Sequence, residues 1–237
     1  MVKPVTADDR RHVLGHKAFA LEHWNTTGTP RGHGFTNDGS SWATFYTRNA
    51  SNAPITYLTL DTVCYDGGAN GRLERDQLDW LEAQLRANSR VYYDESLNLV
   101  TQSGVTDRLI VVFAHHTLRS INNESITNVI DVNDPDFYYG PTVERMLLRY
   151  PNVVLYVCGH THKNEIHAHR RGVVSPLNNT VPGTGGFWEI ATASHIDWPS
   201  RRTRSSPNAW SARRSGRATR RVCGGRWLCG VGGRWPI

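Results

Sequence analysis

Long hydrophobic runs are missing from this sequence. No stretch approaches the roughly 18 consecutive apolar residues that a membrane span requires. The N-terminus, MVKPVTADDRRH, lacks the apolar core of a signal peptide. Together these absences predict a soluble, cytoplasmic chain with no membrane partner. A targeting segment could still precede this chain in a longer parent protein, so export of such a parent remains open.

Cysteine is also scarce. The four cysteines, at positions 64, 158, 223 and 229, form no C-x-x-C pair. This spacing argues against a zinc knuckle and against a disulfide framework. Cys158 belongs to an apolar run, so it is expected to be a small residue of the core.

Acidic residues and lysine are absent from the last part of the chain. Residues 201–237 hold ten arginines and no Asp, Glu or Lys, so the rest of the chain carries 17 basic against 21 acidic residues. Without acid or periodicity, this basic tail is predicted to be disordered. It could bind nucleic acid, because arginine pairs with phosphate and tryptophan stacks on bases. Alternatively, a frameshift near Ser200 produced it, and the chain is the inert product of a truncated gene.

The most informative stretch covers residues 153–162. The apolar run VVLYV at 153–157 predicts a buried strand, and it leads directly into Gly159-His160-Thr161-His162. On an extended chain, the side chains of His160 and His162 would point the same way. Gly159 is expected to allow backbone torsions or a close approach that a Cβ would forbid. Taken alone, this pattern fits a metal site and a solvated polar loop equally well.

A second apolar run also ends in histidine. Residues 108–118 read RLIVVFAHHTL, which predicts a strand rich in β-branched residues with His115 and His116 directly after it. In an open α/β sheet, ligands gather outside the carboxyl ends of the strands. We therefore predict an α/β fold whose strand ends bring His115, His160 and His162 to a common metal site.

These motifs resemble the last two metal motifs of the calcineurin-like metallophosphoesterases. The resemblance runs from Pro30 to Pro199, includes a strand and helix at 60–82, and includes a segment at 185–199 that is similar to actinobacterial members. The Gly-His-Thr-His element is its most specific part. The resemblance implies that residues 1–200 are the C-terminal half of a four-layer α/β/β/α sandwich, incomplete, with residues 1–30 as an insertion.

The resemblance also implies a function. The intact family hydrolyses phosphoesters with a binuclear metal centre, in which a metal-bound hydroxide attacks phosphorus. By this resemblance His115 and His160 would ligate one divalent ion and His162 the other, and Mn, Fe and Zn all suit imidazole.

Three further histidines are candidates for supporting positions beside the ligands. His116 follows the ligand His115 directly, His33 lies between two glycines, and His195 ends a predicted strand at 187–194.

The first half of the family pattern is missing. The sequence contains no Asp-x-His, no Gly-Asp and no Gly-Asn dipeptide. The aspartate that bridges two metals and the general-acid histidine motif are therefore absent, and no catalytic residue is assigned. We expect a fragment that is nearly inactive by itself.

The remaining elements follow from periodicity. Residues 42–47 and 55–61 predict a hairpin, 73–85 an amphipathic helix, and 88–106 a loop. Residues 165–170 alternate in polarity and predict a half-exposed edge strand. Its histidines, His167 and His169, are expected to face water or to cover the mouth of the site.

Overall fold

The computed structural model describes residues 14–37, 42–64, 68–123 and 137–194. His195 and the predictions for the basic tail at 201–237 lie outside the described residues. No helix in the described ranges combines the length and the apolar character needed to cross a membrane.

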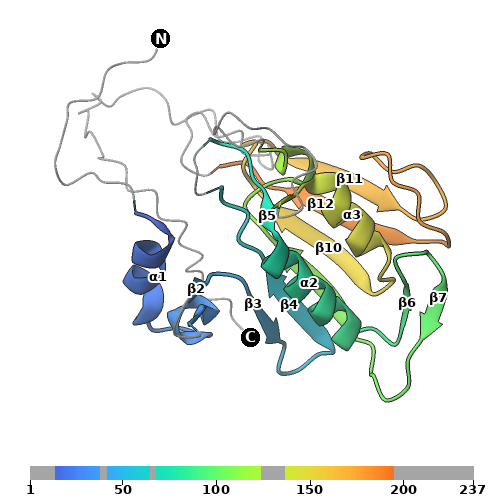
Figure 1. The fold of residues 1–237 in the computed structure, drawn as a ribbon, viewed down its shortest axis with the longest axis horizontal. Helices are drawn as coiled ribbons and strands as arrows, with labels where there is room; N and C mark the ends of the chain where they lie inside the picture. The colour runs from blue at the N-terminus through green and yellow to red at the C-terminus, as the bar shows by residue number, and fades with distance from the viewer. Residues whose placement is uncertain (1–13, 38–41, 65–67, 124–136, 195–237) are drawn as a thin grey trace, which may run out of the picture. The chain divides into compact units, whose positions relative to one another are not determined.

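A six-stranded mixed sheet forms the centre of the described region, in the order β11-β12-β10-β8-β4-β3 (Figure 1). The four inner strands are parallel to one another, and the edge strands β3 and β11 run antiparallel to their neighbours. The mixed α/β class predicted from the sequence is confirmed. The strands are β3 (Tyr46–Asn49), β4 (Ile55–Thr59), β8 (Leu109–Phe113), β10 (Val153–Cys158), β11 (Glu165–Arg170) and β12 (Gly186–Ala191).

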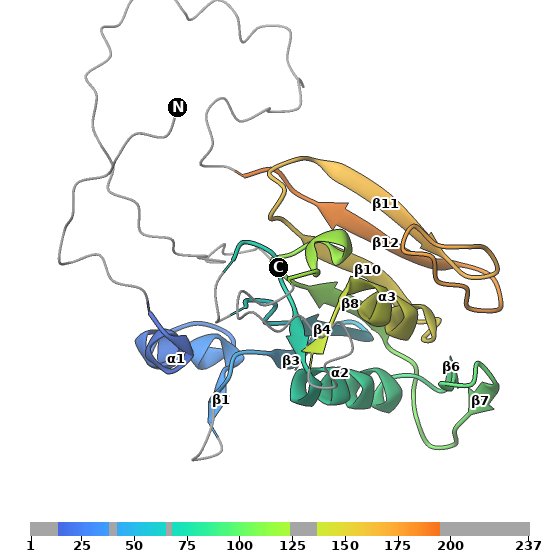
Figure 2. The same ribbon diagram turned by 45° about the horizontal axis from the view of Figure 1, so that its top comes forward.

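Two helices, α2 (Arg75–Ala87) and α3 (Gly140–Leu148), cover one face of the sheet (Figure 1 and Figure 2). The apolar face of α2 packs into the core through Leu78, Leu81 and Leu85. The spacing of these leucines at intervals of three and four residues is what predicted the helix. The helix begins at Arg75, because the two residues before it pair as a short strand.

The shorter elements differ in places from those predicted from the sequence. The predicted loop at 88–106 contains a small hairpin, and the predicted strand at 42–47 is divided into two. Since the helix, the hairpin of β3 and β4, and the central strands are present, these differences concern the borders of the fold. The short elements are α1 (His16–Trp24), η1 (Arg31–Gly34), β1 (Thr36–Asn37), β2 (Trp42–Ala43), β5 (Leu73–Glu74), β6 (Val91–Tyr93), β7 (Leu99–Thr101), η2 (Leu118–Ser120) and β9 (Phe137–Tyr138).

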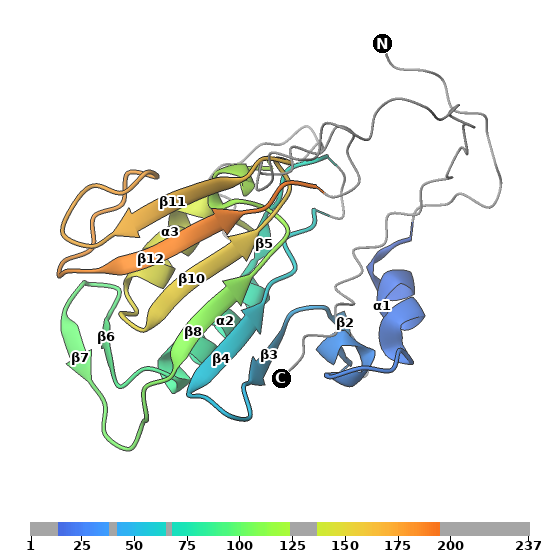
Figure 3. The same ribbon diagram turned by 180° about the vertical axis from the view of Figure 1, so that it is seen from behind.

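No described helix covers the other face of the sheet (Figure 3), and apolar side chains on this face are exposed. Trp188 is 52% exposed and Ile166 is 66% exposed. A continuous exposed apolar surface usually marks a place where something else binds. Two rows of paired residues cross this open face, Tyr57-Val111-Leu155-Trp188-Ala168 and Phe113-Val157-Ile190-Ile166.

Strand β11 lies at the edge of the sheet, as predicted, but the face that carries His169 meets the core and the face that carries Ile166 is exposed. The alternation suggested that His169 faces water, whereas His169 is only 1% exposed and Ile166 points to the open face. His167 is 31% exposed. The prediction for His169 is wrong because alternation separates two faces without showing which one meets the core.

Candidate metal centre

Two segments that carry histidine leave neighbouring strands at the same edge of the sheet. Strands β8 and β10 are parallel and adjacent, and their arrowheads point the same way in Figure 3. His115 and His116 follow β8, and His160 follows β10 after Gly159. The amide of Gly159 donates to the carbonyl of His115 at 3.0 Å, so the pairing of the strands continues into these segments. The topology therefore brings the histidines together.

The rings of His115 and His160 have a spacing that suits a shared metal ion. Nε2 of His115 lies 3.4 Å from Nδ1 of His160. Two nitrogens bound to one tetrahedral zinc ion at its usual bond length are roughly 3.3 Å apart. One nitrogen of His116 belongs to the same cluster, and the three ligand atoms lie within 4.8 Å of one another. The cluster could therefore hold a divalent metal ion.

The surroundings keep these imidazoles neutral. Burial lowers the pKa of His115, and the charges of His160 and His162 lower it further. Burial also lowers the pKa of His160, again with a contribution from His162. Because neutral imidazole is the form that binds a metal, both rings can act as ligands near neutral pH.

His162 stays outside the converging group. The prediction that His160 and His162 point the same way assumed an extended backbone. Instead φ is +66° at His160 and +57° at His162, and the amide of Thr161 donates to the carbonyl of Gly159 at 2.8 Å. Alternation does not apply to such a turn. The side chain of His162 is exposed, and its role as a ligand of a second ion stays a prediction.

The glycine that allows a close approach at the cluster is Gly71 rather than Gly159. A Cβ on Gly159 would meet its nearest atoms at 3.9 Å, an ordinary contact, and φ there is not positive. The special role predicted for Gly159 is therefore wrong. A Cβ on Gly71 would lie 2.5 Å from Nδ1 of His116 and 2.6 Å from the carbonyl oxygen of Thr62. The close approach is therefore between Gly71 and the ring of His116.

His116 is buried, and both of its ring nitrogens have partners. Nε2 lies 3.0 Å from the carbonyl oxygen of Ala69, and Nδ1 lies 2.7 Å from the hydroxyl of Thr62. A carbonyl oxygen only accepts, so Nε2 carries the proton and Thr62 donates to Nδ1. Burial lowers the pKa of His116 to about 4, although the Ala69 carbonyl and Asp61 oppose this shift. His116 would have to give up a hydrogen bond to bind a metal.

Two residues that the sequence did not identify complete the surroundings of the cluster. Thr62 follows β4, a third parallel strand at the same edge, so the rule that found His115 could have found it. Oδ1 of Asn70 lies 3.4 Å from Nε2 of His160. Asn70 belongs to the loop before β5, where the sequence has no pattern that predicts a position near His160.

His33 lies in the η1 turn among aromatic rings. Its ring centroid is 5.1 Å from that of His23 and 5.8 Å from that of Phe35. Gly32 and His33 both have positive φ, which makes the turn tight. His33 does not belong to the group of ligand atoms that converges around His115.

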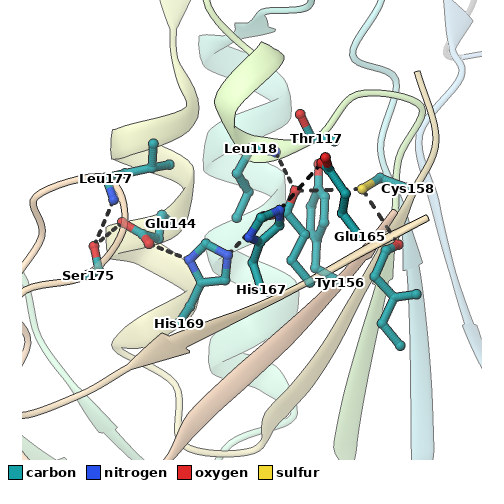
Figure 4. Close-up of polar contacts among 12 residues, drawn as sticks. Thr117, Leu118, Glu144, Tyr156, Cys158, Glu165, His167, His169, Ser175 and Leu177 are labelled. Carbon is teal, nitrogen blue, oxygen red and sulfur yellow. Dashed lines mark hydrogen bonds and ion pairs between the residues drawn. The ribbon is translucent and has the colours of Figure 1, made fainter. Parts of the chain in front are cut away.

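His169 of β11 is buried between two glutamates, an arrangement that the sequence pattern did not predict. Figure 4 shows its ring beside Glu144. Nδ1 of His169 pairs with Glu144 of α3, and Nε2 lies 2.8 Å from Oε2 of Glu189 of β12. Burial lowers the pKa of His169, but its hydrogen bonds and ion pairs with the two carboxylates outweigh this effect and leave it raised. The ring is therefore held as an imidazolium by two carboxylates.

Comparison of the sequence with protein-family models finds no match, and a search of the curated proteins finds no similar sequence. What the chain does must therefore be inferred from its own residues and their geometry.

Proposed function

We propose that this chain derives from a metal-dependent phosphoester hydrolase of the calcineurin-like type, and that His115 and His160 bind one divalent cation. The observation that carries this proposal is the pair of neutral imidazoles with nitrogens 3.4 Å apart at the carboxyl ends of β8 and β10. When bound, a divalent cation supplies Lewis-acid polarisation of the phosphoryl group and an activated water.

The residues around the two ligands have distinct roles in this proposal. Oδ1 of Asn70 only accepts a hydrogen bond, so it favours the proton on Nε2 of His160. Nδ1, which faces His115, is then the free ligand atom. His116 keeps its hydrogen bonds and supports the pocket, and the exposed His162 is proposed to reach a second cation.

The site is incomplete in the described part of the chain. The converging group there consists of histidines, with no carboxylate that could bridge two ions. Asp61 acts on His116 through its charge, but its carboxylate accepts hydrogen bonds from the hydroxyl of Thr44 and the amide of Val63. We therefore expect that this chain binds a cation but hydrolyses phosphoesters poorly without another polypeptide segment.

The open face of the sheet supports the proposal of an incomplete four-layer sandwich. In such a fold one outer layer of helices, here α2 and α3, covers the first sheet, and a second sheet packs about 10 Å away on the other face. The exposed side chains of Trp188 and Ile166 belong to the rows that a second sheet would bury. The missing half of the fold would occupy that face.

A hydrolysis assay with Mn²⁺ tests the proposed function. The full chain is incubated with a nitrophenyl phosphomonoester and a bis-nitrophenyl phosphodiester, and we expect turnover close to that of Mn²⁺ alone. His160→Ala should remove any turnover above that of Mn²⁺ alone. His167→Ala should not, because His167 lies on a different strand outside the cluster.

Two outcomes would contradict the proposal in different ways. Robust turnover that His160→Ala abolishes would show that the ligand set is complete within this chain. Turnover that persists in His160→Ala would place the activity elsewhere.

A further inference from the structure

One buried carboxylate oxygen contacts both segments that carry the metal-site histidines. Glu189 on β12 is 2% exposed. Its Oε1 accepts a hydrogen bond from the backbone amide of Leu118 at 3.0 Å and lies 3.6 Å from the thiol sulfur of Cys158. Leu118 follows His116 by two positions, and Cys158 precedes His160 by two. This oxygen therefore links the segment that follows β8 to the end of β10.

The backbone after His116 is held at three places. Besides the bond from Leu118 to Glu189, the hydroxyl of Tyr156 donates to the carbonyl of His116 at 2.9 Å. The carbonyl oxygen of Leu118 packs so closely on Gly140 of α3 that a Cβ there would lie 1.8 Å from it. β10, β12 and α3 thus fix this turn together, and Glu189 also contacts Cys158, two positions before His160.

The orientation of Glu189 is fixed in turn by His169. Oε2 of Glu189 lies 2.8 Å from Nε2 of His169, which leaves Oε1 facing Leu118. Phe187 stacks on the His169 ring with centroids 4.7 Å apart and planes 7° apart. The thiol of Cys158 donates to Oε1 of Glu189 and, at 3.7 Å, to the carbonyl oxygen of Ile190.

We infer that Glu189, oriented by His169, is a positioning residue that sets the distance between His115 and His160. This inference rests on the proposed function, because the distance matters for a shared metal ion. A metal site binds well only when the groups behind its ligands hold those ligands in place. Glu144 provides a matched comparison, since it is fully buried and bonds to the same His169. Its other hydrogen bonds go to Ser175 and Asn179, which belong to neither histidine segment.

A titration of the full chain with Co²⁺ separates positioning from general stability. The variants are Glu189→Ala, Glu189→Gln and Glu144→Ala, each measured for Co²⁺ affinity, for the Co²⁺ absorption spectrum and for thermal unfolding. We expect Glu189→Ala to weaken Co²⁺ binding by roughly 10- to 100-fold. Glu189→Gln should recover most of this loss, because its amide oxygen can still accept from Leu118. Glu144→Ala should lower the melting temperature while Co²⁺ affinity and the spectrum stay close to those of the unchanged protein.

Equal Co²⁺ affinity in Glu189→Ala and the unchanged protein overturns the inference. An equal loss in Glu144→Ala and Glu189→Ala also overturns it, since that result would reflect general destabilisation. If Glu189→Ala does not fold, Glu189→Asp takes its place, because the shorter side chain withdraws the carboxylate from Leu118 and the same outcomes apply.

A measurement without metal distinguishes failure of this inference from failure of the proposed function. Histidine ring resonances are recorded by NMR in the metal-free proteins. If the unchanged protein binds no Co²⁺, the proposed function fails. The positioning role then stands if Glu189→Ala shifts the His115 and His160 resonances and Glu144→Ala does not, and it fails if both variants leave them unchanged.

Discussion

Nδ1 of His160 lies 3.4 Å from Nε2 of His115, although 45 positions separate the two residues in the chain. Their meeting depends on the parallel pairing of β8 with β10 and on α3, which connects the two strands on one face of the sheet. A parallel pair aligns its carboxyl ends, so side chains that follow the two strands reach the same place. This relationship is the basis of the proposed metal site.

Replacement of Gly71 by alanine should destabilise the protein and displace His116. The added Cβ would lie 2.5 Å from the His116 ring and 2.6 Å from the backbone oxygen of Thr62, and neither group can move freely. Overpacking of this kind costs about 1–3 kcal/mol. Denaturant unfolding measures the change. Gly159→Ala is the control, and it should stay within about 0.5 kcal/mol because its nearest contacts are ordinary. Equal effects of the two changes would contradict the placement of His116.

The free energy of unfolding should depend on pH through His169. Its folded pKa is raised above the ordinary value of 6.5, so its stabilising contribution is complete below pH 6.5 and is lost as pH rises through the folded pKa. Burial raises the pKa of Glu189, but its bonds to His169 and to the Leu118 amide lower it below 4.5 overall. The contribution of Glu189 is therefore complete above pH 4.5 and is lost as pH falls through its folded pKa.

Urea unfolding across this pH range tests the titration of His169. The difference in free energy between the unchanged protein and His169→Gln should be largest between pH 4.5 and 6.5 and should shrink at higher pH. Each tenfold change in proton affinity between the folded and unfolded states corresponds to about 1.4 kcal/mol. The control His167→Gln, which removes a ring that is 31% exposed, should show a small and flat difference. A His169→Gln difference that grows above pH 6.5 would show that the ring is neutral in the folded state.

A charged side chain introduced on the open face of the sheet should leave the stability of the protein nearly unchanged. Ile166 is 66% exposed, so Ile166→Lys should change the free energy of unfolding by less than about 0.5 kcal/mol. Ile110 points to the helix-covered face and is fully buried, so Ile110→Ala should cost about 2–5 kcal/mol. Thermal or denaturant unfolding compares the two. A loss in Ile166→Lys as large as that in Ile110→Ala would mean that the face is already covered in this chain.

The strands that carry the site could be predicted from the sequence. The apolar runs at 109–113 and 153–158 form strands, as expected from continuous apolar runs, which are typical of inner parallel strands. The rule that ligands gather at the carboxyl ends of such strands placed His115 and His160 together. The same apolar runs indicate neither which face receives the helices nor where a turn replaces extended backbone.

Other parts of the site depend on contacts that no local pattern records. The positive φ values at His160 and His162 belong to a turn whose sequence looks extended, so the orientation of His162 could not be predicted. His169 is buried because its partners Glu144 and Glu189 lie 25 and 20 positions away. A polar residue on an edge strand is normally solvated, and only the folded chain supplies the charges that stabilise this one.

The most direct test of the account is a titration of the full, metal-free chain with Zn²⁺ against a chromophoric chelator. We predict one bound equivalent, a loss of affinity of about tenfold or more in His115→Ala and in His160→Ala, and no loss in His167→Ala. Absence of binding, or equal affinity in all four proteins, would contradict the claim that the ends of β8 and β10 form a metal site.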